Sequence, residues 1–215
     1  MNWDNTIHSV TDVVDHAIAN SHTPRLVLAI CSIPPFLSLY RYILRRNESQ
    51  KQNTCVADPI LEILPTYDTS AMISVLSTMS TIVFVYGIFE DPKVYPLIYT
   101  AGHLVFVFFA VSLLRMLSII ICPLRQHKDG ILLRDYFVET VVGDTMSTRH
   151  DLMFSGHVAQ QVLYLYYVPK YTPFFHVMLI GICVALMLGK IHYTIDIFVA
   201  FFVTHYVCNA FPLSG

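Results

Sequence analysis

Charged residues are scarce in this sequence of 215 residues: they make up 13%, against about a quarter in a typical soluble domain. The formal net charge is -2, so the chain lacks the basic excess that is typical of nucleic-acid-binding proteins. Hydrophobic residues make up 55% of the chain. This composition excludes an ordinary soluble domain and favours a protein of the lipid bilayer.

Several signatures of other classes are also missing. The five cysteines are scattered and form no C-x-x-C pair, so neither a disulfide framework nor a zinc site is indicated. No H-E-x-x-H motif and no acidic cluster of the magnesium type occurs, so we expect no metal and no other cofactor. Residues 1–23 contain no Lys or Arg, which argues against a signal peptide. Apolar residues recur there near helical spacing and indicate an amphipathic helix at the membrane surface.

Six segments are apolar enough to cross a bilayer, which requires roughly 20 residues in a helix. They span residues 26–44, 70–89, 97–121, 152–168, 172–188 and 191–211. We therefore predict an all-α, polytopic membrane domain over residues 24–215, built as a bundle of six transmembrane helices. With six spans, the starts of the fourth and sixth lie on one side of the membrane, side B. The charged loop over residues 122–151 lies on this side too.

The start of the sixth span carries the first candidate for chemistry. His192 and Asp196 are four residues apart, so on a helix they share one face. A carboxylate so placed fixes the tautomer of the imidazole and leaves its other nitrogen available as a nucleophile or base. An ionisable residue within an apolar span is costly, which favours a functional interpretation. The two residues could also merely satisfy each other near the interface.

The start of the fourth span carries the second candidate. Ser155 or Asp151 can cap the helix, and Gly156 leaves room for the close approach of a ligand. The free N–H groups at a helix start suit a phosphate. His157, in the first turn, could then donate a proton to a leaving alkoxide. Taken alone, this segment would also fit an ordinary capped helix.

Phosphoryl transfer also needs positive charge near the transferred oxygens. Arg115 lies inside the third span and on side B, where a phosphate would be a suitable partner. Arg149 and Lys190 are further candidates for binding the substrate phosphate, although each could be a solvated loop charge. Arg125 and Lys128 are weaker candidates of the same kind.

At these residues the sequence resembles the sphingomyelin synthase family, a branch of the type-2 phosphatidic acid phosphatase superfamily. The matching stretches are residues 151–157 and 192–197 with Val199 and Ala200, and Arg115 with Ser118 resembles a further pair in that family. The run from Ser155 to Ala159 is also similar to plant cholinephosphotransferases that act on diacylglycerol. His150 departs from the family pattern, which has glycine there, and Leu186 stands where the phosphatase branch has arginine.

The resemblance implies a catalytic triad of His157, His192 and Asp196 and a six-span fold. His192 would attack the phosphorus of a glycerophospholipid, and His157 would protonate the departing diacylglycerol. The resulting phosphohistidine would pass phosphocholine or a related group to ceramide or diacylglycerol. The partners expected are therefore these lipids and the bilayer, in an endomembrane (Golgi or endoplasmic reticulum) or the plasma membrane.

Two alternatives and one conflict stay open at this point. The chain could be a lipid phosphate phosphatase in which water is the acceptor, or a non-catalytic membrane scaffold. Side B carries more Lys and Arg than the opposite side, so the positive-inside rule places the site in the cytoplasm. The resemblance implies a site that faces the lumen or the exterior.

Overall fold

The computed structural model describes residues 56–90, 97–122, 124–133 and 154–212, of which 97–101 are described by their backbone alone. It also places six residues of the preceding segment: Pro35, Ser38, Leu39, Tyr42, Ile43 and Arg46. Over this part of the chain the structure is helical and contains no β-strand. The elements are α3 (Pro59–Ile63), α4 (Ser70–Glu90), α5 (Leu97–Ile121), α7 (Gly156–Tyr167), the 3₁₀ helix η2 (Pro169–Tyr171), α8 (Thr172–Leu188) and α9 (Thr194–Ala210).

Three of these helices are long and apolar enough to cross a membrane: Ser70–Glu90, Gly102–Ile121 and Pro169–Leu188. They fall on the second, third and fifth spans predicted from the sequence. Helix α9 is apolar but shorter, at 17 residues. The predicted first span (26–44) and the amphipathic segment (1–23) lie almost wholly outside the described residues. The fold is therefore an all-helical membrane protein with three candidate spans, and the full set of six stays a prediction.

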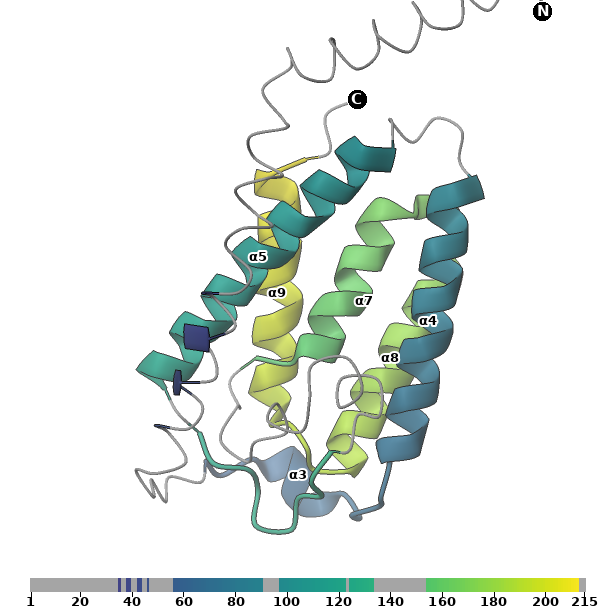
Figure 1. Cartoon of the computed structure of the whole chain (residues 1–215). Helices are drawn as coiled ribbons and strands as arrows, with labels where there is room; N and C mark the ends of the chain where they lie inside the picture. The colour runs from purple at the N-terminus through teal and green to yellow at the C-terminus, as the bar shows by residue number, and fades with distance from the viewer. Residues whose placement is uncertain are drawn as a thin grey trace, which may run out of the picture.

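The fourth predicted span is shorter than the sequence indicated. Helix α7 has 12 residues and begins at Gly156 rather than at residue 152. The amide of Gln160 on α7 contacts Thr81 of α4, a residue that lies about 16 Å beyond the start of α4 at 1.5 Å per residue. Helix α7 therefore begins well inside the bundle, as Figure 1 shows. Its first turn consequently lies recessed between the longer helices.

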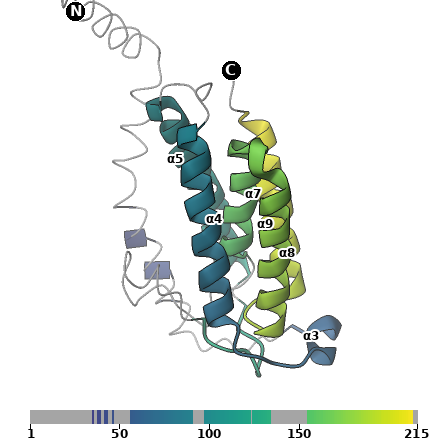
Figure 2. The same cartoon turned by 90° about the vertical axis from the view of Figure 1, so that its right-hand side faces the viewer.

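Five helices run side by side, and their order brings the two candidate segments to one end. Figures 1 and 2 show that α4 and α9 start at the end of the bundle that carries α3, that α5 and α8 finish there, and that α7 runs away from the same end. This arrangement agrees with the span count made from the sequence. The turn between α8 and α9, which carries His192, thus lies at the same end as the start of α7.

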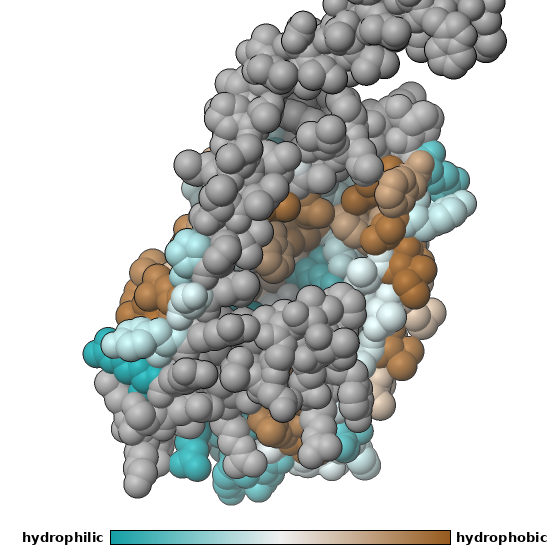
Figure 3. Space-filling view, in the orientation of Figure 1, coloured by the Kyte–Doolittle hydropathy of each residue, from teal (hydrophilic) through white to brown (hydrophobic). Residues whose placement is uncertain are grey.

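The helices bury apolar side chains between them and expose others outward. Phe84 of α4 stacks on Tyr164 of α7, with ring centroids 4.1 Å apart. Phe175, Ile182 and Ala200 are fully buried in the same core. The outer surfaces carry exposed apolar side chains, which appear brown in Figure 3. Large exposed apolar areas of this kind indicate contact with lipid.

Asp58 joins the loop before α4 to the start of α9. Its carboxylate accepts hydrogen bonds from the backbone N–H groups of Ile60 and Leu61, which caps α3. It also accepts from the N–H of Thr194, at 2.8 Å, and from the hydroxyl of Thr194, at 3.2 Å. Burial raises the pKa of this carboxyl, but the hydrogen bonds together outweigh burial and leave the pKa below its usual value.

We predict that Asp58→Ala lowers the stability of the protein by about 1–2 kcal/mol, because two helix starts lose their cap. The difference in stability between the wild type and Asp58→Ala should reach its full size above the ordinary carboxyl pKa of about 3.9. It should vanish as the pH falls through the lowered pKa of Asp58. Thermal unfolding of both proteins in detergent between pH 2 and pH 7 measures it. Glu62→Ala, which removes an exposed carboxylate of α3, is the control. A loss of stability that does not depend on pH would contradict the capping role.

Candidate active site

The site is built first by the tight turn that joins α8 to α9. Helix α8 ends at Leu188, Gly189 follows as its C-cap, and Lys190 adopts a left-handed backbone conformation with φ 48°. His192 follows in the turn and precedes the first residue of α9, Thr194. The sequence argument placed His192 and Asp196 on one helix face. The structure instead places His192 before the helix and Asp196 in the first turn of α9.

His192 and Asp196 are nevertheless in contact. The Nδ1 atom of His192 lies 3.3 Å from Oδ2 of Asp196, and the side chains are 8% and 0% exposed. The same oxygen accepts a hydrogen bond from the backbone N–H of Tyr193 at 2.9 Å. Because a carboxylate can only accept, this contact favours the proton on Nδ1 and leaves Nε2 with its lone pair. The pair can therefore present an oriented imidazole nitrogen for nucleophilic attack.

The start of α7 is bonded directly to the start of α9. The backbone N–H of Ser155 donates to the carbonyl of Asp196 at 3.5 Å. The Ser155 hydroxyl accepts from the N–H of Val158, also at 3.5 Å, and so caps α7 as the sequence predicted. His157 is the second residue of α7, and its side chain is half-buried. The structure thus brings the segment of His157 beside the segment of His192.

Arg115 approaches this helix start from α5. A Cβ atom added to Gly156 would lie 2.7 Å from Nη1 of Arg115, closer than real Cβ contacts allow. A side chain at this position would therefore displace the Arg115 guanidinium from the start of α7. An arginine at a helix N-terminus concentrates positive charge where a phosphate could bind.

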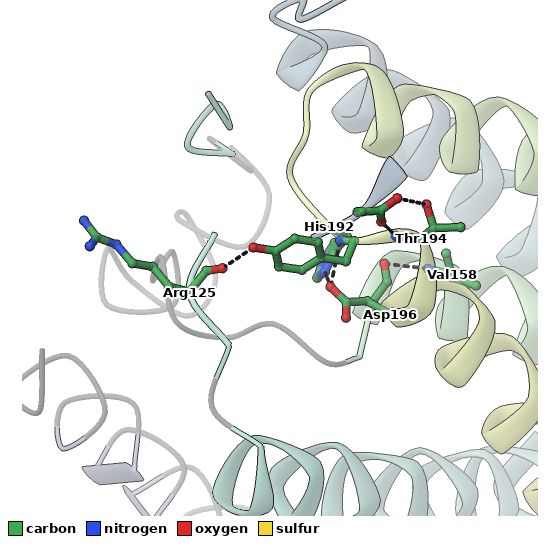
Figure 4. A network of polar contacts seen from close by, with 8 residues as sticks. Arg125, Val158, His192, Thr194 and Asp196 are labelled. Carbon is green, nitrogen blue, oxygen red and sulfur yellow. Dashed lines mark hydrogen bonds and ion pairs between the residues drawn. The ribbon is translucent and has the colours of Figure 1, made fainter. Parts of the chain in front are cut away.

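The loop over residues 124–133 packs on the turn that carries His192. The Tyr193 hydroxyl donates to the carbonyl of Arg125 at 2.8 Å, and the N–H of Ile131 donates to the carbonyl of Gly189 at 3.0 Å. Lys190 is buried, with its Nζ atom 3.9 Å from Asp129. Figure 4 shows that the Arg125 side chain points away from His192, so only its backbone enters this network.

The residues that remain are one predicted phosphate ligand, Arg149, and three histidines for which the sequence predicts no catalytic role. Arg149 lies outside the described residues, so its predicted role stays untested. His103, His176 and His205 contact Tyr167, the Thr172 carbonyl and Tyr166 respectively, away from the two catalytic candidates. No group of three or more His, Cys, Asp or Glu is placed to hold a metal in the described part of the chain. Sequence reasoning missed Asp58 and Tyr193, because neither belongs to a recognisable motif.

Comparison with known families points to the same region. Residues 150–212 match the family model described as the C-terminal part of the PAP2 superfamily. The match supports the superfamily that the motifs suggested, and it contains all three triad candidates. Members of the PAP2 superfamily are usually phosphatases or phosphotransferases, so the match supports an enzyme acting on lipid phosphates. No curated protein matches the sequence.

We predict that Gly156→Ala lowers catalytic turnover about tenfold or more while the protein stays folded. Alanine suits the first turn of a helix, but its methyl group would displace the Arg115 guanidinium from the phosphate position. Steady-state kinetics with a lipid substrate, together with thermal unfolding, separate the two effects. Gly181→Ala on α8, whose added methyl meets only Leu76, is the control. Unchanged turnover in Gly156→Ala would show that Arg115 does not bind the substrate phosphate.

Proposed function

We propose that this chain transfers a phospho-alcohol head group, such as phosphocholine, from a glycerophospholipid to ceramide or diacylglycerol through a phosphohistidine. The observation that carries the proposal is the buried contact between His192 and Asp196, bonded through the backbone to the start of α7. The PAP2 match and the three candidate membrane helices support a lipid phosphate as substrate. The resemblance to sphingomyelin synthases supplies the transfer step.

The first half-reaction forms a covalent intermediate. The Nε2 atom of His192 attacks phosphorus, and the bond from phosphorus to the diacylglycerol oxygen breaks. His157 gives its proton to that oxygen, so diacylglycerol leaves as a neutral alcohol. Asp196 stabilises the positive charge that develops on the imidazole of His192.

The second half-reaction reverses these roles. His157, now neutral, takes the proton of the acceptor hydroxyl, and the acceptor oxygen attacks the phosphorus. The bond between phosphorus and His192 breaks, which restores the free histidine. Arg115, Lys190 and Arg149 would offset the charge on the transferred oxygens, together with the backbone N–H of Gly156.

Water in place of the acceptor lipid would give a hydrolase with the same residues. The PAP2 superfamily contains phosphatases, so this is the second candidate. The two candidates share the first half-reaction and differ only in what enters the site afterwards. A transferase must therefore admit a lipid hydroxyl while keeping water from the phosphohistidine.

The covalent intermediate can be tested directly. Protein incubated with phospholipid labelled in its phosphate should retain label that is stable in base and released in acid, as expected for a phosphoramidate. His192→Ala should retain none, whereas His157→Ala should still be labelled slowly because the nucleophile remains. Label on both histidine variants, or on neither the wild type nor His157→Ala, would contradict the proposal.

We predict that Asp196→Asn lowers turnover by about 10³- to 10⁴-fold, because an amide no longer selects the reactive tautomer of His192. Asn keeps the size of Asp196, so KM should change much less than kcat. The comparison is Asp129→Asn, which alters an exposed carboxylate beside the same turn. An equal loss in both variants would show that general charge, rather than the His192 contact, matters.

The nature of the acceptor needs a product assay in mixed micelles. Phosphatidylcholine labelled in choline is supplied with short-chain ceramide and diacylglycerol, with and without His192→Ala. We expect label in a lipid product from the wild type and none from the variant. Label released only as water-soluble phosphocholine would establish the hydrolase. No turnover with phosphatidylcholine, phosphatidylethanolamine or phosphatidylinositol would favour a scaffold.

A further inference from the structure

A polar cluster lies between α4 and α7, deeper in the bundle than His157. The amide nitrogen of Gln160 is 2.6 Å from the Tyr164 hydroxyl and 3.2 Å from the Thr81 hydroxyl. The two hydroxyls are 3.0 Å apart, and Thr81 is 2.8 Å from the carbonyl of Ser77. In Figure 3 hydrophilic atoms lie in a hollow between apolar surfaces on this face of the molecule. Polar groups at this depth are costly, which favours a functional interpretation.

The hydrogen atoms available fix the orientation of the Gln160 amide. Four contacts need four hydrogens, and these are the two of the amide nitrogen, one of Tyr164 and one of Thr81. With the amide reversed, only the two hydroxyl hydrogens would remain for the same contacts. The network therefore holds the Gln160 nitrogen inward. Its Oε1 atom accepts no hydrogen bond within the described residues, and the side chain is half-buried.

Gln160 lies one turn of α7 beyond His157, on the same side of the helix. The two residues are separated along the axis by about 4.5 Å, from the rise of 1.5 Å per residue. A lipid whose reacting oxygen sits at His157 would place the polar groups of its backbone near Gln160. Its acyl or alkyl chains would continue toward the apolar part of the bundle.

Helix α4 carries further hydroxyl groups beside this cluster. Ser77 and Ser74 lie on the same face of α4 as Thr81, one and two turns nearer the end that carries the site. Their hydroxyls are buried and have no hydrogen-bond partner within the described residues. Buried hydroxyls without a partner call for an explanation, and a polar ligand beside this face of α4 would supply one.

We propose that Gln160 determines acceptor specificity by accepting a hydrogen bond from the amide N–H of a sphingoid-type lipid, an inference that rests on the function proposed above. Ceramide carries this N–H on the carbon next to that of the reacting hydroxyl. Diacylglycerol has an ester oxygen at the same place, which can only accept. Thr81 and Tyr164 are positioning residues, because they act by orienting the amide of Gln160.

The test compares three acceptors of equal chain length with the full-length protein: ceramide, ceramide methylated on the amide nitrogen, and diacylglycerol. We expect the wild type to favour ceramide over the other two by about tenfold or more in kcat/KM, since a lost hydrogen bond leaves Oε1 without a partner. Gln160→Met, which keeps the length of the side chain, should reduce this preference to within about threefold. Thr81→Val should reduce it partly, because the amide is then free to rotate.

Two matched variants control for general damage. Gln161→Met alters the adjacent glutamine, which is fully buried and whose amide has no partner among the described residues, and should keep the ceramide preference. Thr78→Val is the same substitution as Thr81→Val but at an exposed position of α4, and this variant should also keep the preference for ceramide. An equal fall for all three acceptors in Gln160→Met would mean a structural role. Discrimination against diacylglycerol but not against the methylated ceramide would assign the contact to another group of the lipid.

A binding measurement separates this inference from the proposed function. Thermal stabilisation of His192→Ala by each acceptor, without donor lipid, requires no turnover. We expect ceramide to raise the unfolding temperature more than the methylated ceramide, and the difference to vanish when Gln160→Met is added. Equal stabilisation would overturn the role of Gln160 even if head-group transfer is established. A preserved difference without any transfer would leave Gln160 in place and reject the transferase.

Discussion

The carboxylate of Asp196 is the contact on which the site depends. One of its oxygens is shared by His192 and the N–H of Tyr193, and its backbone carbonyl accepts from Ser155. These bonds join the nucleophile candidate, the start of α9 and the start of α7 within a few ångströms. Since the side chain is fully buried, removing its charge would leave several polar groups unsatisfied at once. The residue whose carboxylate orients the histidine is therefore also the one whose backbone carbonyl bonds the start of α7.

The bilayer explains why this assembly is recessed. A phospholipid presents its phosphate near the surface and its chains inside, so an enzyme must bring polar residues partly into the apolar region. The short helix α7 does this by starting below the ends of its neighbours, which places its first turn and His157 inside the bundle. Gly156 makes room there for the Arg115 guanidinium. The short length of α7, the missing side chain at Gly156 and the position of Arg115 together place a guanidinium at the recessed start of α7.

Much of this could be predicted from the sequence, and the remainder has identifiable physical causes. Long apolar runs set the bounds of α4, α5 and α8 to within a residue or so of expectation. The apolar residues 152–154 led the predicted span to begin too early, although the cap residue Ser155 is the local signal that places the start of α7 at Gly156. Asp58 escaped notice because its partner Thr194 is 136 residues away and no local pattern links them. His192 and Asp196 were found as a pair, although the turn rather than a helix face brings them together.

In the proposed function, the specificity residue Gln160 and the catalytic candidate His157 lie one turn apart on one face of α7. His157 and Gln160 occupy the same side of α7, so any shift that moves one moves the other. The Gln160 amide is oriented by Thr81 and Tyr164, whereas the start of α7 is capped by Ser155. The two sets of hydrogen bonds share no residue. Under the proposed function, a substitution at α4 would therefore alter the choice of acceptor lipid and leave His157, His192 and Asp196 unchanged.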